Sequence, residues 1–368
     1  MNNKANANLA WVALYMIHGL GHTIFKKLLD QFGKPETVFK AQQNDIAIVA
    51  GKEVARRIVK RQFTSDPEKE LLKIEKAGVN IINFYDHAYP ALLKEIHRPP
   101  MLLFAKGLPI PLQQIMISVV GTRNPTHYGI KTAEMIGLEL AKKRVGVVSG
   151  MAYGIDTAAH RGCLKGKGYT IAVLGCGVDV IYPASNKKLV EQLIEHGTII
   201  SEFPLGAPPE ARNFPIRNRI ISGLTDGVVV VEAAKKSGSL ITASLALDQG
   251  REVFAVPGSI DSFKSRGTHH LIRQGAKLIE NVDDILDEFE FQRFPEGGEV
   301  FNKTRPHVSL SLNDEERKIY NTLGQYPLHI DEIVRMSGLD PGRISSILME
   351  MELKEIVKQL TGKRFIVT

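Results

Sequence analysis

The stretch SVVGTRNPTHYG, from Ser118 to Gly129, carries an apolar run into a glycine turn that contains an arginine. A dinucleotide-binding turn needs three glycines in the order G-x-G-x-x-G, whereas Gly121 is followed by no further glycine until Gly129. Arg123 stands in this turn, and its planar guanidinium can donate two hydrogen bonds to a phosphate while the amides of the turn supply the rest. The spacing therefore favours a phosphate bound partly by a side chain.

Polar residues also follow the later apolar run DGVVVVE. Ser237, Gly238 and Ser239 come at the start of an expected helix, where free amides and hydroxyls form an anion site. Other glycine-bearing turns follow apolar runs at residues 121–123, 149–156, 174–186 and 201–206, and each alone also fits a plain tight turn. Because the carboxyl ends of parallel strands meet at one edge of a sheet, we expect these turns to converge there.

The segment FPIRNRIISG places Arg217 and Arg219 on either side of Asn218. Residues two apart on a helix diverge by about 200 degrees. We therefore expect at least one of these arginines to pair with an acid such as Glu202 or Glu232, and the other to bind phosphate.

Two aromatic residues and two lysines complete the candidate site. The rings of Tyr182 and Phe214 can stack nucleic-acid bases, with core packing as the alternative. Lys187 and Lys188 add positive charge after the turn at 174–186. The full set of expected nucleic-acid-binding residues is Gly121, Thr122, Arg123, Tyr182, Asn186, Lys187, Lys188, Phe214, Arg217, Asn218, Arg219, Ser237, Gly238 and Ser239.

Catalytic signatures are missing from the sequence. No G-x-S-x-G nucleophile elbow occurs, and the adjacent His269 and His270 cannot both face one metal ion. Asp156 and Asp179 follow expected strands, where each can act as a general base or cap a turn. We predict no catalytic residues, no metal site and no cofactor.

Composition indicates a globular protein of two or three domains, since 43% of the 368 residues are hydrophobic and 24% are charged. The net charge is +7, and residues 289–368 contribute none of this excess of basic residues. A polyanionic partner therefore fits the first 288 residues, although the positive charge could also serve only to keep the protein soluble. Two cysteines are too few for a disulfide framework and fit a reducing cytoplasm. No apolar run reaches the ~20 residues of a membrane span.

The pattern of apolar residues divides the chain into four parts. Residues 1–75 predict short helices broken at glycines, and residues 76–289 alternate strands with helices, which is typical of a Rossmann-like α/β core with a parallel sheet. The expected strands are VNIINF, IMISVVG, VGVVSG, YTIAVLG, GTIISE, DGVVVVE and EVFAVPG. Residues 290–311 are rich in Pro, Gly and charge and predict a linker.

The two ends of the chain resemble known nucleic-acid-binding elements. Near the N-terminus, Gly19, Leu20 and Gly21 resemble the turn of a helix-hairpin-helix, whose amides can bind a nucleic-acid phosphate. Residues 312–368 predict three helices and a terminal strand, the order of a winged helix, with Asn313 as an N-cap. Because residues 313–368 hold 8 basic and 9 acidic residues, we expect a protein contact or weak duplex binding there.

Six motifs together, over about residues 80–285, resemble the DNA-processing protein A family (DprA or Smf): GTR, SGMAYGID, LGCGVDVIYP, FPIRNRIISGL, SGSLITA and VFAVPG. The resemblance implies a protein without known catalytic turnover that binds single-stranded DNA in a basic pocket, forms a homodimer and loads RecA recombinase during natural transformation. The pocket arginine of the family matches Arg123. The family's pocket lysine follows a Tyr-Pro pair, where this chain has Ala184, so the role passes to Lys187 or Lys188.

The sequence also allows two alternative hypotheses for the function. A nucleotide-binding enzyme of the Rossmann-like phosphoribohydrolase type would use Glu232 to act through water, but its PGGxGT signature is replaced by KSGSLITA. An NAD(P) oxidoreductase would need the missing glycine fingerprint.

For the dimer, we expect the helix in GTHHLIRQGAKLIENVDDIL to form the contact, with Leu271 and Ile272 at its surface.

Overall fold

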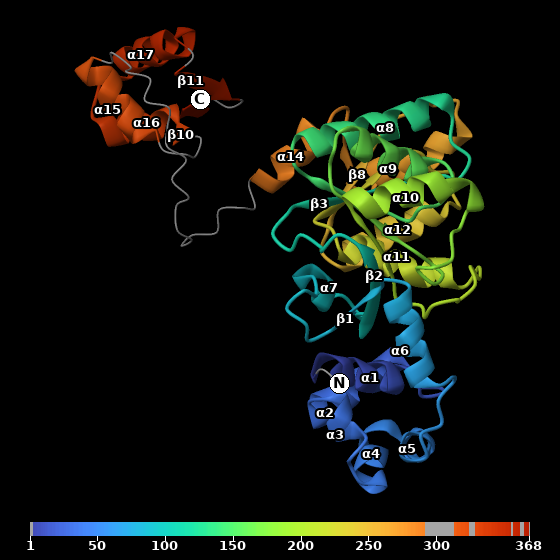
Figure 1. Ribbon diagram of the computed structural model, residues 1–368. Helices are drawn as coiled ribbons and strands as arrows, with labels where there is room; N and C mark the ends of the chain where they lie inside the picture. Colours follow the sequence, from blue (N-terminus) through green and yellow to red (C-terminus); the bar gives the residue numbers. More distant parts are fainter. Residues whose placement is uncertain (1–2, 291–312, 324–327, 355, 361–363, 368) are drawn as a thin grey trace. The chain divides into compact units, whose positions relative to one another are not determined.

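The structure is a computed structural model that describes residues 3–290, 313–323, 328–354, 356–360 and 364–367 (Figure 1). It divides into two compact units, Met1–Arg293 and Phe294–Thr368. The expected linker over residues 290–311 lies outside the described residues except for its first residue. Among the described helices, none combines the length and the apolar character that crossing a membrane requires.

The first described segment forms helices around its own apolar core. Trp11, Leu14 and Phe25 are buried there and pack with Leu102 of the neighbouring sheet, so this segment and the sheet form one unit. Glycines end two of the helices, and short helices appear that the sequence pattern did not predict. The helices are α1 (Asn3–Tyr15), α2 (His22–Phe32), α3 (Pro35–Val38), α4 (Gln43–Ala50), α5 (Lys52–Val59) and α6 (Pro67–Lys76). The Gly19–Gly21 turn joins α1 to α2, and its contact with nucleic acid stays a prediction.

A mixed sheet forms the centre of the first unit. Its described strands are β1 (Asn80–Asn83), β2 (Leu102–Gly107), β3 (Met116–Val120), β4 (Gly146–Ser149), β5 (Thr170–Val173), β6 (Thr198–Ser201), β7 (Gly227–Val230), β8 (Glu252–Ala255) and β9 (Lys277–Leu278). They lie in the order β1-β2-β6-β5-β4-β3-β7-β8-β9. Within this order, the seven neighbouring strands β6-β5-β4-β3-β7-β8-β9 are parallel to one another, as expected. In contrast, β2 is antiparallel to both β1 and β6.

Helices cover both faces of this sheet (Figure 1). Alternate strand residues explain why, because Val120 and Val148 pack with α11 and α12, whereas Val119 and Val147 pack with α8 and α9. The helices are α7 (Ala91–Glu95), α8 (His127–Lys142), α9 (Ile155–Lys165), α10 (Lys187–His196), α11 (Asn213–Gly223), α12 (Gly238–Asp248), α13 (Arg266–Arg273) and α14 (Asp283–Glu290).

The second unit is a winged helix. Its elements are α15 (Asp314–Thr322), β10 (Leu328–His329), α16 (Ile330–Ser337), α17 (Pro341–Leu353), β11 (Val357–Leu360) and β12 (Arg364–Val367), and its sheet has the order β10-β12-β11. Asn313 caps α15 in a reciprocal capping box with Glu316, which confirms the predicted helix start. On α17, Met349 and Leu353 are exposed, and Arg343 pairs with Glu315 at 2.8 Å.

Candidate nucleic-acid interface

A groove of about 600 Å³ lies where loops from β3, β4 and β7 meet the start of α11. The chain runs from β3 outward through β4, β5 and β6, and then returns to β7 on the other side of β3. The order of strands therefore reverses between β3 and β7, which is where open parallel sheets bind ligands. Nine of the predicted residues line the groove: Gly121, Arg123, Tyr182, Phe214, Arg217, Asn218, Ser237, Gly238 and Ser239.

The turn after β3 is held by backbone contacts and by Glu232. A Cβ at Gly121 would lie 2.6 Å from Cγ1 of Ile155, so only glycine fits where the turn passes α9. Thr122 does not line the groove; its N–H donates to the Glu232 carbonyl at 2.8 Å, which fixes the turn. The Glu232 carboxylate accepts hydrogen bonds from the N–H of Thr126 at 2.8 Å and from its hydroxyl. Glu232 therefore anchors the start of α8. In the alternative hypothesis of a phosphoribohydrolase-type enzyme, this carboxylate would instead activate a water molecule.

Phe214 is the centre of a cluster of rings and cations at the mouth of the groove. The Cζ atoms of Arg123 and Arg217 lie 5.1 and 5.9 Å from the centroid of its ring. The Tyr182 ring lies 5.7 Å away at an interplanar angle of 36°, and it is 38% exposed. Neither ring belongs to the described apolar core, which leaves base stacking open to both. Arg123 is exposed, and no carboxylate of the described residues pairs with it.

Arg217 forms the buried, positive floor of the groove. Its Nη1 donates hydrogen bonds to the carbonyl of Gly150 at 2.6 Å and to the carbonyl of Val173, which ties the loops after β4 and β5 together. Its Nε has no hydrogen-bond partner in the described residues. Burial lowers the pKa of Arg217 to about 10, the nearby Asp156 opposes this shift, and Arg123 adds to it. At any pH below that value the floor remains cationic.

Asp156 caps the loop after β4 rather than standing free as a base. Its carboxylate accepts hydrogen bonds from the N–H groups of Gly150 at 3.1 Å and Ala152 at 3.3 Å. Burial raises the pKa of Asp156, while the charge of Arg217 lowers it. Asp179 likewise accepts from the N–H of Gly206 at 2.9 Å. Both acids have the capping role that the sequence left as one alternative.

The start of α12 supplies the far wall of the groove. Ser237 is the N-cap, and its hydroxyl oxygen accepts from the N–H of Ser239 at 3.4 Å and lies 2.8 Å from the Ser239 hydroxyl. Asn218 of α11 donates to the Gly238 carbonyl at 3.4 Å, which joins the two helices at this point. The helix N-terminus with two hydroxyls thus lines the same groove as Arg123, where it favours an anion.

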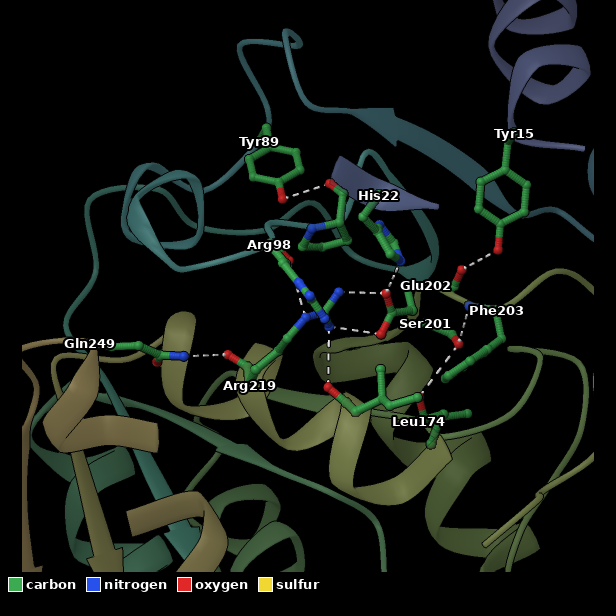
Figure 2. A network of polar contacts seen from close by, with 12 residues as sticks. Tyr15, His22, Tyr89, Arg98, Leu174, Ser201, Glu202, Phe203, Arg219 and Gln249 are labelled. Atoms are coloured by element: carbon green, nitrogen blue, oxygen red, sulfur yellow. Dashed lines mark hydrogen bonds and ion pairs between the residues drawn. The ribbon is translucent and has the colours of Figure 1, made fainter. Parts of the chain in front are cut away.

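Arg219 does not line this groove and lies instead in a network of polar contacts around Glu202 (Figure 2), so its expected contact with nucleic acid stays a prediction. Its guanidinium donates to both Glu202 oxygens, at 2.8 and 2.7 Å, because two positions along a helix turn it away from Arg217. His22 of α2 lies 3.2 Å from Oε2 of Glu202, and the hydroxyl of Tyr15 donates to the Glu202 carbonyl at 2.7 Å. Burial alone would raise the pKa of Glu202, but His22 and Arg219 outweigh it and hold the pKa below its usual range.

Three other predicted residues lie away from the groove lining. Asn186 is buried, and its amide donates to the Met151 carbonyl and to the Thr157 hydroxyl at 3.1 and 2.8 Å, so in this structure it holds the loop after β4, and its contact with nucleic acid stays a prediction. Lys187 and Lys188 are exposed at the start of α10, and their contact with nucleic acid stays a prediction.

Sequence reasoning also missed one aromatic and misplaced one apolar residue. Tyr153, in the glycine loop after β4, is 49% exposed and shares a small pocket with Arg123 and Phe214; an aromatic between glycines was the available signal. Leu271 is 6% exposed and packs in the core, so it cannot form a dimer surface. Ile272 is half-buried.

Comparison with known proteins matches nearly the whole chain to one family. The family model for DNA recombination-mediator protein A matches residues 80–290, and the model for the DprA winged helix domain matches residues 303–363. Protein Smf of Synechocystis is 34% identical over 98% of this chain and 99% of its own length. DNA processing protein DprA of Bacillus subtilis is 44% identical over 62% of this chain and 77% of its own.

Solved structures agree with this match. The X-ray structure of DNA processing protein A from Streptococcus pneumoniae superposes with a TM-score of 0.69 at 39% identity, covering 76% of this chain and 97% of that one. DNA processing protein A from Helicobacter pylori, solved for its single-stranded DNA binding mode, gives 0.52 at 29% identity over 58% and 97% of the two chains. The chain therefore belongs to the DNA recombination-mediator protein A family, DprA/Smf.

Proposed function

We propose that this protein is a recombination mediator that binds single-stranded DNA in the groove between β3 and β7. The observation that carries the proposal is the position of Arg123 and Arg217 about one ring, that of Phe214, in this groove. Unpaired strands are bound by a positive groove that follows the phosphates and by rings that stack the bases. Arg123 and the start of α12 are suited to phosphates, and Phe214 and Tyr182 are suited to bases.

The same arrangement favours binding with little dependence on base sequence. Stacking on a ring accepts every base, and the charged groups act on the backbone. Such a protein can hold incoming strands and load RecA recombinase on them during natural transformation, and we propose these roles for this chain. A cytoplasmic location is consistent with the two free, buried cysteines, Cys163 and Cys176.

A homodimer is part of the proposal. Around α13 and β9, Ile260 is 84% exposed and Leu278 is 43% exposed, and they line a surface groove with Ile272. Exposed apolar groups gathered in this way are typical of a protein contact. We therefore keep this region as the dimer contact, with Leu278 in place of the buried Leu271.

Titration at several salt concentrations tests the proposed substrate. Labelled oligo-dT, duplex DNA of equal length and NAD would each be added to the full chain. We expect oligo-dT to bind most tightly, with an affinity that falls steeply as salt rises, because phosphate contacts release counterions. Equal or tighter binding of duplex DNA or of NAD would overturn the proposal.

A further inference from the structure

A second cavity adjoins the groove between β3 and β7 at the start of α11. Pro215, in the first turn of α11, lines both spaces. The second cavity has a volume of about 350 Å³, and Ile216, which is 45% exposed, forms part of its wall. Its remaining lining comes from the core and from the N-terminal helices: Tyr15, His22, Arg98, Glu202, Phe203, Arg219 and Leu245.

Charge in this second cavity is unbalanced toward the positive. Glu202 is the only acid among its described lining residues, and Arg219 and His22 already engage both of its oxygens. Arg98 is exposed, and no described residue forms an ion pair or hydrogen bond with its side chain. Its backbone is nevertheless fixed, because Nε of Arg219 donates to the Arg98 carbonyl at 3.1 Å (Figure 2). A guanidinium is thus held at the cavity without an acidic partner.

Part of the wall of the second cavity is apolar. Phe203, Pro215 and Ile216 line the cavity together with Leu245. A cation beside apolar groups suits a nucleotide chain, in which each charged phosphate alternates with a sugar and a base. A small free anion would make no use of the apolar wall or of the neighbouring groove, which shares Pro215 with the cavity.

We propose that single-stranded DNA leaves the Phe214 groove over Pro215 and Ile216 and enters the second cavity, where Arg98 binds a backbone phosphate. This inference rests on the proposed function, since it extends the same strand. It gives the N-terminal helices a place in the DNA path, because Tyr15 of α1 and His22 of α2 line the cavity.

Binding of an oligo-dT series, from about four to about twenty nucleotides, tests this path. The variants would be Arg98→Ala, Arg98→Lys and the control Arg144→Ala. Arg144 is matched to Arg98, because it is also exposed, has the same φ of 59° and forms no described ion pair. It directly precedes β4 and so lies at the amino ends of the parallel strands, whereas the groove lies at their carboxyl ends. All proteins would be checked for an unchanged fold by circular dichroism and thermal melting.

We expect Arg98→Ala to bind the shortest strands like the wild type and to lose about two- to fivefold in affinity for long strands at low salt. Its salt dependence for long strands should become shallower by about 0.7 in slope, with Arg98→Lys restoring most of both. Equal affinities of Arg98→Ala and Arg144→Ala at every length would overturn the inference. If that result came while Arg123→Ala still weakened binding, only the second cavity would be lost; if wild type bound no oligo-dT, the proposed function itself would fail.

Discussion

Replacing Arg219 by methionine tests whether the Glu202 network is a structural brace rather than part of the DNA interface. Methionine keeps much of the apolar bulk of the arginine stem but removes its charge and its hydrogen bonds to Glu202, Arg98 and Ile216. Glu202 would then remain as a carboxylate that is 3% exposed, with His22 as its remaining side-chain partner.

The size of the effect follows from burial. Removing one partner of a buried ion pair costs about 3 to 5 kcal/mol, because the other charge stays in a poorly solvated site. The Arg219 side chain keeps 11% exposure and His22 is retained, so we expect the lower end, about 3 kcal/mol of unfolding free energy. Adding Glu202→Gln to Arg219→Met should recover about 1 to 3 kcal/mol, since the uncompensated charge disappears.

Urea unfolding of the full chain measures this effect. The single tryptophan, Trp11, is buried in α1, so its fluorescence reports the segment that the network joins to the sheet. The affinity of the folded variant for oligo-dT of about four nucleotides should stay within about twofold of wild type, because Arg219 does not line the groove that contains Phe214. Wild-type stability together with a large loss of affinity would refute the assignment of Arg219 as a brace.

Three further predictions concern pH, the ring and the dimer. The pKa of Glu202 is lowered in the folded protein, so the charged carboxylate stabilises the fold. In urea unfolding at several pH values, the stability advantage of wild type over Glu202→Gln should be complete above the ordinary glutamate pKa of 4.5 and should shrink as the pH falls below it. A difference that does not change with pH would contradict this. Phe214→Ala should lose about 1 to 3 kcal/mol of oligo-dT affinity in a fluorescence titration while Phe214→Tyr keeps most of it, and equal affinities would exclude stacking on this ring. Leu278→Asp should give a monomer by light scattering. The control Ile48→Asp, at an apolar residue of α4 that is 85% exposed, should leave the dimer intact. If the Leu278→Asp protein remained a dimer, the proposed dimer contact at Leu278 would be wrong.

Much of the α/β core was predictable because its strands are buried on both faces. Continuous apolar runs such as ISVV and GVVV could only be central strands, and the glycine turns after them had to meet at one edge. The antiparallel β2 was missed because its run, LLFAKG, begins one residue after a proline pair and ends with a lysine and a glycine. The two-residue β9 is too short to produce a periodic signal.

The site was less predictable, because side-chain direction depends on partners far away in the sequence. The helical spacing of Arg217 and Arg219 predicted their divergence, but which one meets Glu202 depends on how α11 packs against the sheet. Asn186 was expected to bind nucleic acid, yet it is buried and its amide donates to the Met151 carbonyl. Arg98 and His22 gave no local signal, since the cavity they line forms only when the helices dock on the sheet.

The most direct measurement is the affinity of Arg123→Ala for oligo-dT at fixed low salt, beside wild type and Arg123→Lys. Arg123 is exposed in the groove and has no described ion pair, so its replacement should leave the melting temperature nearly unchanged. We expect a loss of about 1.5 to 3 kcal/mol of binding free energy for alanine and a smaller loss for lysine, which keeps the charge without the two-pronged hydrogen bond. A folded Arg123→Ala protein that binds oligo-dT as tightly as wild type would contradict the placement of single-stranded DNA in this groove.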